Sequence, residues 1–366
     1  MKLTRQVSGK NFSYVDSKNE KLKDKEKLNY IKSMVIPPAW TDVEITTNKS
    51  AKILAVGRDQ KGRKQYIYNP KFRAQKDADK FDRILHFAEN LEHMRRVTGQ
   101  HLRKKKMTRE KVLAAMVRLL DSAYFRPGSP KYTKENQSYG LTTIRKKHLN
   151  IEGDEMVFSY KGKSGKFQEK HIIDSKLTKV ISEIGELPGY RLFKYYDKDN
   201  NLITVESQDL NDYIREIMGA EFSAKDFRTW AGTMIAAGIL DELGICEEKQ
   251  QKELKKRIRN AIVAVSEKLG NTPSVARSSY IDPRIFEHYK NGHTVHYFQK
   301  EIKKLLRKNE NLSETELGVL YMLKSKMTGT GKKPQAASRK TTKSAAKVSA
   351  EQIIEDLSYV IDEISR

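Results

Sequence analysis

The sequence has one cysteine, two tryptophans and no apolar run long enough to cross a bilayer. A single thiol, Cys246, excludes an intramolecular disulfide framework and a zinc site built from cysteines. A membrane helix needs about 18 or more apolar residues in a row, and no apolar segment of the secretion-signal kind follows Met1. These absences favour a soluble, intracellular protein.

The motifs of several common chemistries are also missing. Residues 161–167, KGKSGKF, have neither the spacing nor the final Ser or Thr of a Walker A loop. Residues 197–208 open like a calcium loop, but Leu202 stands where that loop needs glycine, so a hairpin turn is expected instead. His148 and His171 lack metal-ligand spacing, and no Gly-x-Ser-x-Gly elbow occurs. We therefore expect neither ATP-driven, metal-dependent nor serine-hydrolase chemistry, and no cofactor.

Positive charge is what the chain has in excess. Its 366 residues include 71 Lys and Arg against 47 Asp and Glu, so the formal net charge is +24. A surface this basic is typical of proteins that bind a polyanion, and nucleic acid is the leading candidate because phosphate binding releases counterions. The length favours two domains and a tail.

The hydrophobic pattern predicts an α+β protein with two domains of different character. Residues 1–75 alternate short apolar runs with turn signals, which predicts a small β-rich domain. Residues 76–326 predict a larger, mainly helical domain, with one helix capped by Thr108 and another starting in a capping box at Ser223. Within it, residues 142–173 predict a three-stranded β meander.

The end of the chain differs in composition from both domains. Residues 327–349 are small, polar and basic, and they predict a flexible linker that could also touch DNA. Residues 350–366 place apolar side chains on one face of a short amphipathic helix. We expect this helix to dock on the body of the protein; binding a partner is the alternative.

Five residues in separate motifs resemble the active site of one enzyme family. Arg126 lies in YFRPGSPKYTKEN, Lys163 in FSYKGKSGKF, Arg228 in SAKDFRTWAG, and Asn271 and Tyr280 in LGNTPSVARSSYIDP. Their order and contexts resemble type IB DNA topoisomerases of the small poxvirus-like and bacterial kind. The segments VIPPAW and AVGRDQKGRKQYIYNP resemble the N-terminal domain of that family, so the resemblance covers roughly residues 30–290.

The resemblance implies an enzyme that clamps duplex DNA between its two domains. It would nick one strand through a 3′-phosphotyrosyl intermediate, let the broken end rotate to relax supercoils of either sign, and reseal without ATP or metal. Its partner would be double-stranded DNA. We expect a monomer in the cytoplasm, associated with the chromosomal DNA of a bacterial nucleoid rather than with a virion.

The resemblance also assigns a role to each of the five residues. Tyr280 is the expected nucleophile, and Arg126 and Arg228 would bind the non-bridging phosphate oxygens, because guanidinium matches phosphate and stays charged. Lys163 would protonate the leaving 5′ oxygen. Asn271 would add one hydrogen bond where viral members commonly have histidine, and an amide carries no charge. We expect Arg228 at the edge of the apolar face of its helix.

Further residues are expected to grip DNA. Cations position the backbone, while Gln and Tyr can reach base edges or phosphates. The expected contacts are Arg63, Lys64, Gln65, Tyr66, Tyr68, Lys131, Tyr132 and Lys225. Tyr66 and Tyr68 share one face of a strand, and packing of that face in the sheet is the alternative interpretation.

Two other functions fit part of the pattern. A tyrosine recombinase has a similar constellation and also forms a 3′-phosphotyrosine, but it usually has a helical domain where this chain predicts strands. A non-catalytic nucleoid protein would explain the charge but would form no covalent complex with DNA.

Overall fold

A computed structural model describes residues 2–9, 11–246, 250–306 and 311–325. The chain divides into two compact units, Met1–Asp82 and Arg83–Arg366. The predicted domain boundary at residue 75 falls a few residues earlier, inside a helix that crosses from one unit to the next. The predicted linker and terminal helix lie outside the described residues. In the part that is described, no helix is long and apolar enough to cross a membrane.

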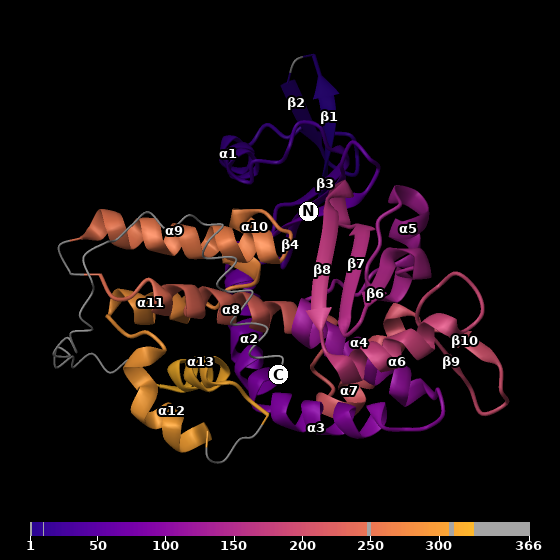
Figure 1. Ribbon diagram of the computed structural model, residues 1–366. Helices are drawn as coiled ribbons and strands as arrows, with labels where there is room; N and C mark the ends of the chain where they lie inside the picture. The colour runs from indigo at the N-terminus through magenta and orange to yellow at the C-terminus, as the bar shows by residue number, and fades with distance from the viewer. Residues whose placement is uncertain (1, 10, 247–249, 307–310, 326–366) are drawn as a thin grey trace. The chain divides into compact units, whose positions relative to one another are not determined.

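The first unit is built on a five-stranded antiparallel sheet with the order β2-β1-β3-β4-β5 (Figure 1). Its strands are β1 (Lys2–Ser8), β2 (Asn11–Val15), β3 (Thr41–Thr46), β4 (Ile53–Arg58) and β5 (Lys64–Tyr68). The small core contains Leu3, Val43 and Ile45, together with Ile31 from a helix, α1 (Lys25–Ser33). The β-rich prediction is confirmed. The helix, capped by Asp24, was not predicted.

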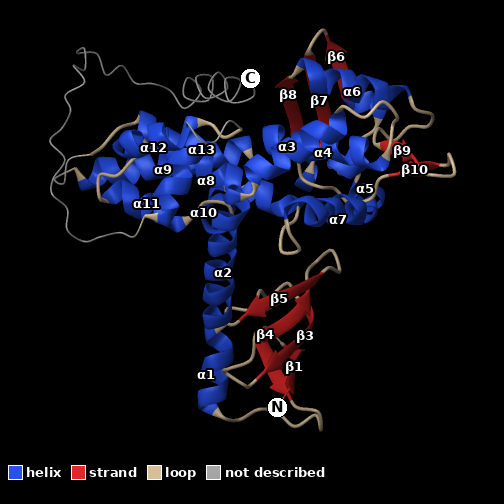
Figure 2. Ribbon diagram, turned by 90° about the horizontal axis from the view of Figure 1, so that it is seen from below, coloured by secondary structure: helices blue, strands red, loops and turns tan. Residues whose placement is uncertain are grey.

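The second unit is mainly helical and contains a three-stranded antiparallel sheet, β6-β7-β8, as predicted. Its helices are α2 (Pro70–Glu89, which begins in the first unit), α3 (Leu91–Leu102), α4 (Arg109–Ala123), α5 (Pro130–Asn136), α6 (Ser175–Glu186), α7 (Ser207–Met218), α8 (Ala224–Glu242), α9 (Gln251–Lys268), α10 (Pro273–Ser279), α11 (Pro283–Lys290), α12 (Gln299–Leu306) and α13 (Glu314–Lys324). Its strands are β6 (Leu149–Glu152), β7 (Glu155–Lys161), β8 (Phe167–Ile173), β9 (Lys194–Tyr196) and β10 (Leu202–Thr204). Within this unit, helices α8 to α13 gather on one side and the sheet with α4 to α7 on the other (Figures 1 and 2).

The central helix of the second unit is α8. The side chain of Asp226 accepts hydrogen bonds from the backbone and hydroxyl of Ser223, which is the predicted capping box. Buried residues occur on every face of α8, so this helix has no solvent side over most of its length. Arg228 is therefore 3% exposed and fully within the core, not at the edge of an apolar face as expected. Burial forces its guanidinium to find acceptors inside the protein.

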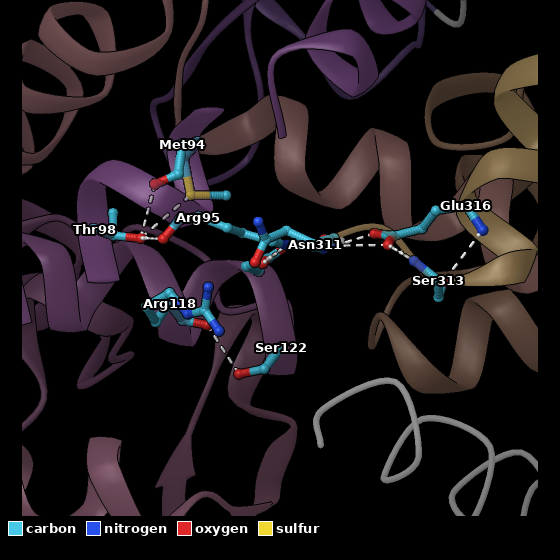
Figure 3. A network of polar contacts seen from close by, with 9 residues as sticks. Met94, Arg95, Thr98, Arg118, Ser122, Asn311, Ser313 and Glu316 are labelled. Atoms are coloured by element: carbon cyan, nitrogen blue, oxygen red, sulfur yellow. Dashed lines mark hydrogen bonds and ion pairs between the residues drawn. The ribbon is translucent and has the colours of Figure 1, made fainter. Parts of the chain in front are cut away.

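A buried ion network fastens the end of the described chain to the earlier helices (Figure 3). Arg95 on α3 donates to both carboxylate oxygens of Asp121 on α4, at 2.8 and 3.0 Å. It also donates to both oxygens of Glu316 on α13, at 2.8 and 2.6 Å. Desolvation opposes the charge on Arg95, but the two carboxylates outweigh it and hold its pKa well above the ordinary value. One guanidinium thus joins three helices.

Replacing Arg95 by alanine should destabilise the second unit strongly. The change leaves Asp121 and Glu316 buried without their cation, and breaking a buried ion pair typically costs about 3–5 kcal/mol. Urea unfolding followed by helical circular dichroism measures the loss. The neighbouring Arg96→Ala is the control, because Arg96 is exposed and should change stability by less than about 0.5 kcal/mol. Equal midpoints for the two variants would contradict the structural role of the network.

Candidate active site

The carbonyls of residues 268–270, at the end of α9 and just after it, gather three basic side chains from different parts of the second unit. Arg126 donates to the Gly270 carbonyl at 2.8 Å, Arg228 to the Leu269 carbonyl at 2.7 Å, and Lys170 to the Lys268 carbonyl at 3.4 Å. A helix C-terminus exposes unpaired carbonyls and carries a partial negative charge, so it attracts cations. We call these three side chains the α9 basic cluster.

The chain that leads to Arg126 is fixed by the end of α4. Tyr124 adopts a left-handed conformation, with φ 58°, that ends the helix. Phe125 then points into the core, where its ring stacks on Tyr160 with centroids 5.9 Å apart. Arg228 donates to the Tyr124 carbonyl at 2.6 Å. The backbone before Arg126 is thus held from both sides, which orients its guanidinium.

Asn271 completes the same arrangement from the α9–α10 turn. Gly270 has φ +62°, a left-handed conformation that favours glycine in this turn. The Asn271 side-chain oxygen accepts from Arg126 at 2.6 Å. Its amide nitrogen is buried and, like Nε of Arg228, has no acceptor among the described residues. Buried donors without acceptors are costly, which makes both atoms candidates for binding an anion.

Tyr280 is held against the middle of α8. It follows α10, which Thr272 caps, and its backbone carbonyl comes so close to Gly232 that a Cβ there would be 2.4 Å away. The Thr233 hydroxyl lies 3.4 Å from the same carbonyl and accepts from the Asp282 amide at 3.1 Å. Gly232 is thus required by close approach of two backbones, and it sets the position of the tyrosine.

The phenol of Tyr280 lies in a positive electrostatic environment. The centre of the Arg228 guanidinium is 5.1 Å from the centroid of its ring. Burial would raise the pKa of Tyr280, but the charge of Arg228, a hydrogen bond with it, and the charges of Arg126 and Lys225 outweigh burial and lower this pKa. Burial and the charge of Arg126 in turn lower the pKa of Arg228 to about 10. The lowered pKa makes the phenolate that a nucleophile needs easier to form than in an ordinary tyrosine.

Lys163 is separate from the other four predicted residues. It lies exposed in the short 3-10 turn Lys163–Gly165, at the tip of the hairpin that joins β7 and β8. Ser164 and Gly165 both have positive φ, 62° and 76°, which makes this tip a tight turn. Among the described residues, no hydrogen bond or ion pair connects Lys163 to Tyr280 or to the two arginines. The structure brings together Tyr280, Arg126, Arg228 and Asn271.

Lys170 was not predicted as a site residue. The signal was present in the sequence, because lysine stands at an inward position in the alternating pattern of β8. Its cross-strand partner is the buried Phe158, and the next inward residue is the buried Ile172. Burial, then the charges of Arg228, Lys268 and Arg126, lower the pKa of Lys170 to about 7.

The expected DNA contacts of the first unit lie around the edge strand β5. Tyr66 and Tyr68 are 41% and 45% exposed, and their rings stack with centroids 5.9 Å apart. This exposure excludes the alternative that their face packs in the sheet core. Arg63 and Gln65 both donate to the Asp59 carboxylate, at 2.8 and 2.9 Å. Chiefly through its hydrogen bond with Arg63, the pKa of Asp59 is lowered to about 2.

The other four expected contacts are also exposed, three of them on the second unit and Lys64 on the first. Lys131 and Tyr132 lie on α5, where Tyr132 is 56% exposed and the Lys131 amine is 3.9 Å from Glu135. Lys225 is exposed in the first turn of α8, and its charge acts on Tyr280. Lys64 is exposed on β5, with its amine 5.8 Å from the Tyr66 ring centroid. All four are accessible to a ligand, and their contact with DNA stays a prediction.

Comparison with known proteins identifies the family. A family model of the catalytic core of eukaryotic DNA topoisomerase I matches residues 69–309, and one of the N-terminal domain of bacterial DNA topoisomerase IB matches residues 11–59. The chain is 32% identical to DNA topoisomerase 1B of Acanthamoeba polyphaga mimivirus over 79% of its own length and 87% of the relative's. It is 28% identical to DNA topoisomerase 1B of Vaccinia virus (strain Copenhagen), over 72% and 81% of the two chains.

The chain therefore belongs to the type IB DNA topoisomerases. It is an enzyme of that family, and family membership implies that it binds DNA. The predicted fold class and enzyme class are confirmed. The roles of single residues remain predictions.

Gly232→Ala should impair cleavage of DNA without removing any polar group. The added methyl must displace the Tyr280 carbonyl, and a shift of about 1 Å in a reacting group can cost about 10²-fold in rate. Single-turnover cleavage of a duplex measures the effect. Gly238→Ala on the same helix is the matched control, because nothing lies within 4 Å of a Cβ at that position. Unchanged cleavage in Gly232→Ala would show that this contact does not position the nucleophile.

Proposed function

We propose that Tyr280 attacks a phosphodiester of duplex DNA and forms a 3′-phosphotyrosyl enzyme. The observation that carries the proposal is the convergence of Tyr280 with Arg126, Arg228 and Asn271, two of which keep a buried donor without an acceptor. A phosphate oxygen is an acceptor of the charge and geometry that these donors require.

Cleavage transfers the phosphoryl group from the 5′ oxygen of DNA to the Tyr280 oxygen. The Tyr280 oxygen forms a bond to phosphorus while the bond from phosphorus to the 5′ oxygen breaks. The phenol proton passes to solvent, and the leaving oxygen takes a proton from Lys163. Negative charge builds on the non-bridging oxygens during the step, so contacts with the two guanidiniums strengthen toward the transition state.

Resealing reverses this chemistry. The free 5′ hydroxyl attacks the phosphotyrosine and gives its proton to Lys163, while the released Tyr280 oxygen takes a proton from solvent. One phosphodiester is exchanged for another, so the energy of the broken bond is kept and ATP is not needed. Between the two steps the broken end rotates about the intact strand, which relaxes positive and negative supercoils.

Both units contribute surfaces to DNA binding in this proposal. Exposed cations and the stacked Tyr66 and Tyr68 on the first unit suit phosphate and base contacts, as do Lys131 and Tyr132 on the second. Arg63 pairs with Asp59 through Nε and one terminal nitrogen, and its side chain is exposed. We further propose that the enzyme acts as a monomer on bacterial chromosomal DNA in the cytoplasm, in keeping with the match to a bacterial N-terminal domain.

Tyr280→Phe should abolish supercoil relaxation and the covalent complex with DNA while leaving DNA affinity within about threefold, since only the attacking oxygen is removed. Plasmid relaxation without ATP or magnesium, and trapping on a nicked suicide duplex, are the measurements. Tyr297→Phe is the control, because Tyr297 is an exposed tyrosine. A covalent complex formed by Tyr280→Phe would assign the nucleophile to another residue. Relaxation that required paired sites would favour a recombinase.

Lys163→Ala should slow cleavage of ordinary DNA by about 10²–10⁴-fold, the usual range for loss of a general acid. The defect should shrink strongly when sulfur replaces the leaving 5′ oxygen, because a thiolate leaves without protonation. Single-turnover cleavage of the two substrates tests this. Lys166→Ala, also exposed beside the tip of the same hairpin, is the control for general loss of charge. Equal defects on both substrates would refute the acid role of Lys163.

A further inference from the structure

Lys170 lies on the inward face of β8, between Gln168 and Ile172 and opposite buried side chains of β7. In β8, side chains alternate between the two faces of the sheet. The face toward the body includes the buried Ile172, and across the ladder it meets the buried Met156, Phe158 and Tyr160 of β7. Lys170 lies opposite Phe158 on this face and is half-buried. A lysine at such a position is costly unless its amine has a function or a charged partner.

The surroundings of the Lys170 amine carry positive charge. Its neighbours are Arg126 from the loop after α4, Arg228 from α8 and Lys268 from the end of α9. The titratable phenols of this region are Tyr160 on β7 and Tyr280 after α10, and both interact with Arg126 and Arg228. Among the described residues, no carboxylate pairs with Lys170. In the same described part of the chain, the hydrogen bond of the amine is the 3.4 Å contact with the Lys268 carbonyl, and an ammonium has three N–H donors.

We propose that Lys170 is an additional phosphate-binding residue of the active site, and that its amine takes up a proton from solvent when DNA enters. The inference rests on the proposed function, because the anion that it binds is the scissile phosphodiester. In the free enzyme the amine is surrounded by like charges and by apolar side chains, and both disfavour protonation. An incoming phosphate supplies the missing negative charge, so the ammonium becomes the favoured form and donates to a phosphate oxygen.

The lowered pKa of Lys170 determines whether DNA binding takes up or releases a proton. In the free protein the pKa of about 7 leaves most Lys170 amines neutral at pH 8. Bound phosphate raises this pKa, so DNA binding above pH 7 takes up a proton and weakens as the pH rises.

The same lowered pKa affects folding stability. In the unfolded chain, Lys170 keeps its proton up to the ordinary pKa of lysine. The resulting cost to stability is full below about pH 7 and fades as the pH rises toward that ordinary value.

The test measures proton uptake during DNA binding in the full chain. All proteins carry Tyr280→Phe, so that binding is observed without cleavage. Calorimetric titration with one duplex, in buffers of different ionisation enthalpy, counts the protons taken up between pH 6.5 and 8.5. Lys170→Met removes the amine at similar volume, and Lys170→Arg keeps a charge that cannot titrate. Lys179→Met on α6 is the control, because Lys179 is exposed on a helix outside the site.

With Lys170 in place we expect close to one proton taken up per duplex at pH 8, and affinity falling by nearly tenfold per pH unit above about pH 7.5. Lys170→Arg should bind without this uptake and with a flat pH profile over the same range. Lys170→Met should lose the uptake and bind more weakly at pH 6.5, and Lys179→Met should match the parent. If Lys170→Met does not fold, Lys170→Arg alone decides the question.

Equal proton uptake in the parent and in Lys170→Arg would overturn the inference. The parallel assay of covalent complex formation by the chain with Tyr280 intact separates this failure from failure of the proposed function. A chain that forms the complex but shows no Lys170-dependent uptake has the proposed activity without this proton-linked contact. A chain that forms no complex loses the proposed function itself.

Discussion

The site depends on the interaction between the last carbonyls of α9 and the cations that they hold. Helix ends leave carbonyls without intrahelical partners, and here Leu269 and Gly270 use them to orient Arg228 and Arg126. Burial lowers the pKa of both arginines, and repulsion from the charge of Arg126 lowers that of Arg228 further. The helix end compensates part of that repulsion. The positive charges of Arg228 and Arg126 lower the pKa of Tyr280, and they would also stabilise a dianionic transition state.

Helix α8 also positions Tyr280, the nucleophile that we propose. Because the helix is buried on every face, Arg228 cannot swing out to solvent, and Gly232 and Thr233 fix the Tyr280 backbone one turn further along. Tyr280 and Arg228 are thus both held in place by the same helix. Burying charge in this way costs stability, and the unit keeps its helices together by other means, among them the Arg95 network across α3, α4 and α13.

The hairpin formed by β7 and β8 carries two lysines that are placed differently with respect to the site. Its tip carries Lys163 exposed and away from the other four residues, although the resemblance assigns it a role in proton transfer. The middle of its second strand carries Lys170, whose amine is influenced by the charges of Arg126 and Arg228. An exposed side chain at the tip of a hairpin is free to reach toward bound DNA. A side chain on the inward face of a strand is held in place by the sheet. We expect Lys163 to be ordered by DNA and Lys170 to respond to its charge.

The sequence by itself determined much of this protein. Local signals sufficed for the β-rich first unit, the meander, the caps at Thr108 and Ser223, and the motifs around Tyr280, because caps, turns and alternation act over a few residues. It did not show that Arg228 is buried, that α1 forms, which face Tyr66 presents, or that Lys170 joins the cluster. Those facts depend on contacts between residues far apart in the chain, such as Arg126 with Asn271 or Tyr280 with Gly232. Only tertiary packing brings such groups together, and desolvation and mutual charge act on them only after it has done so.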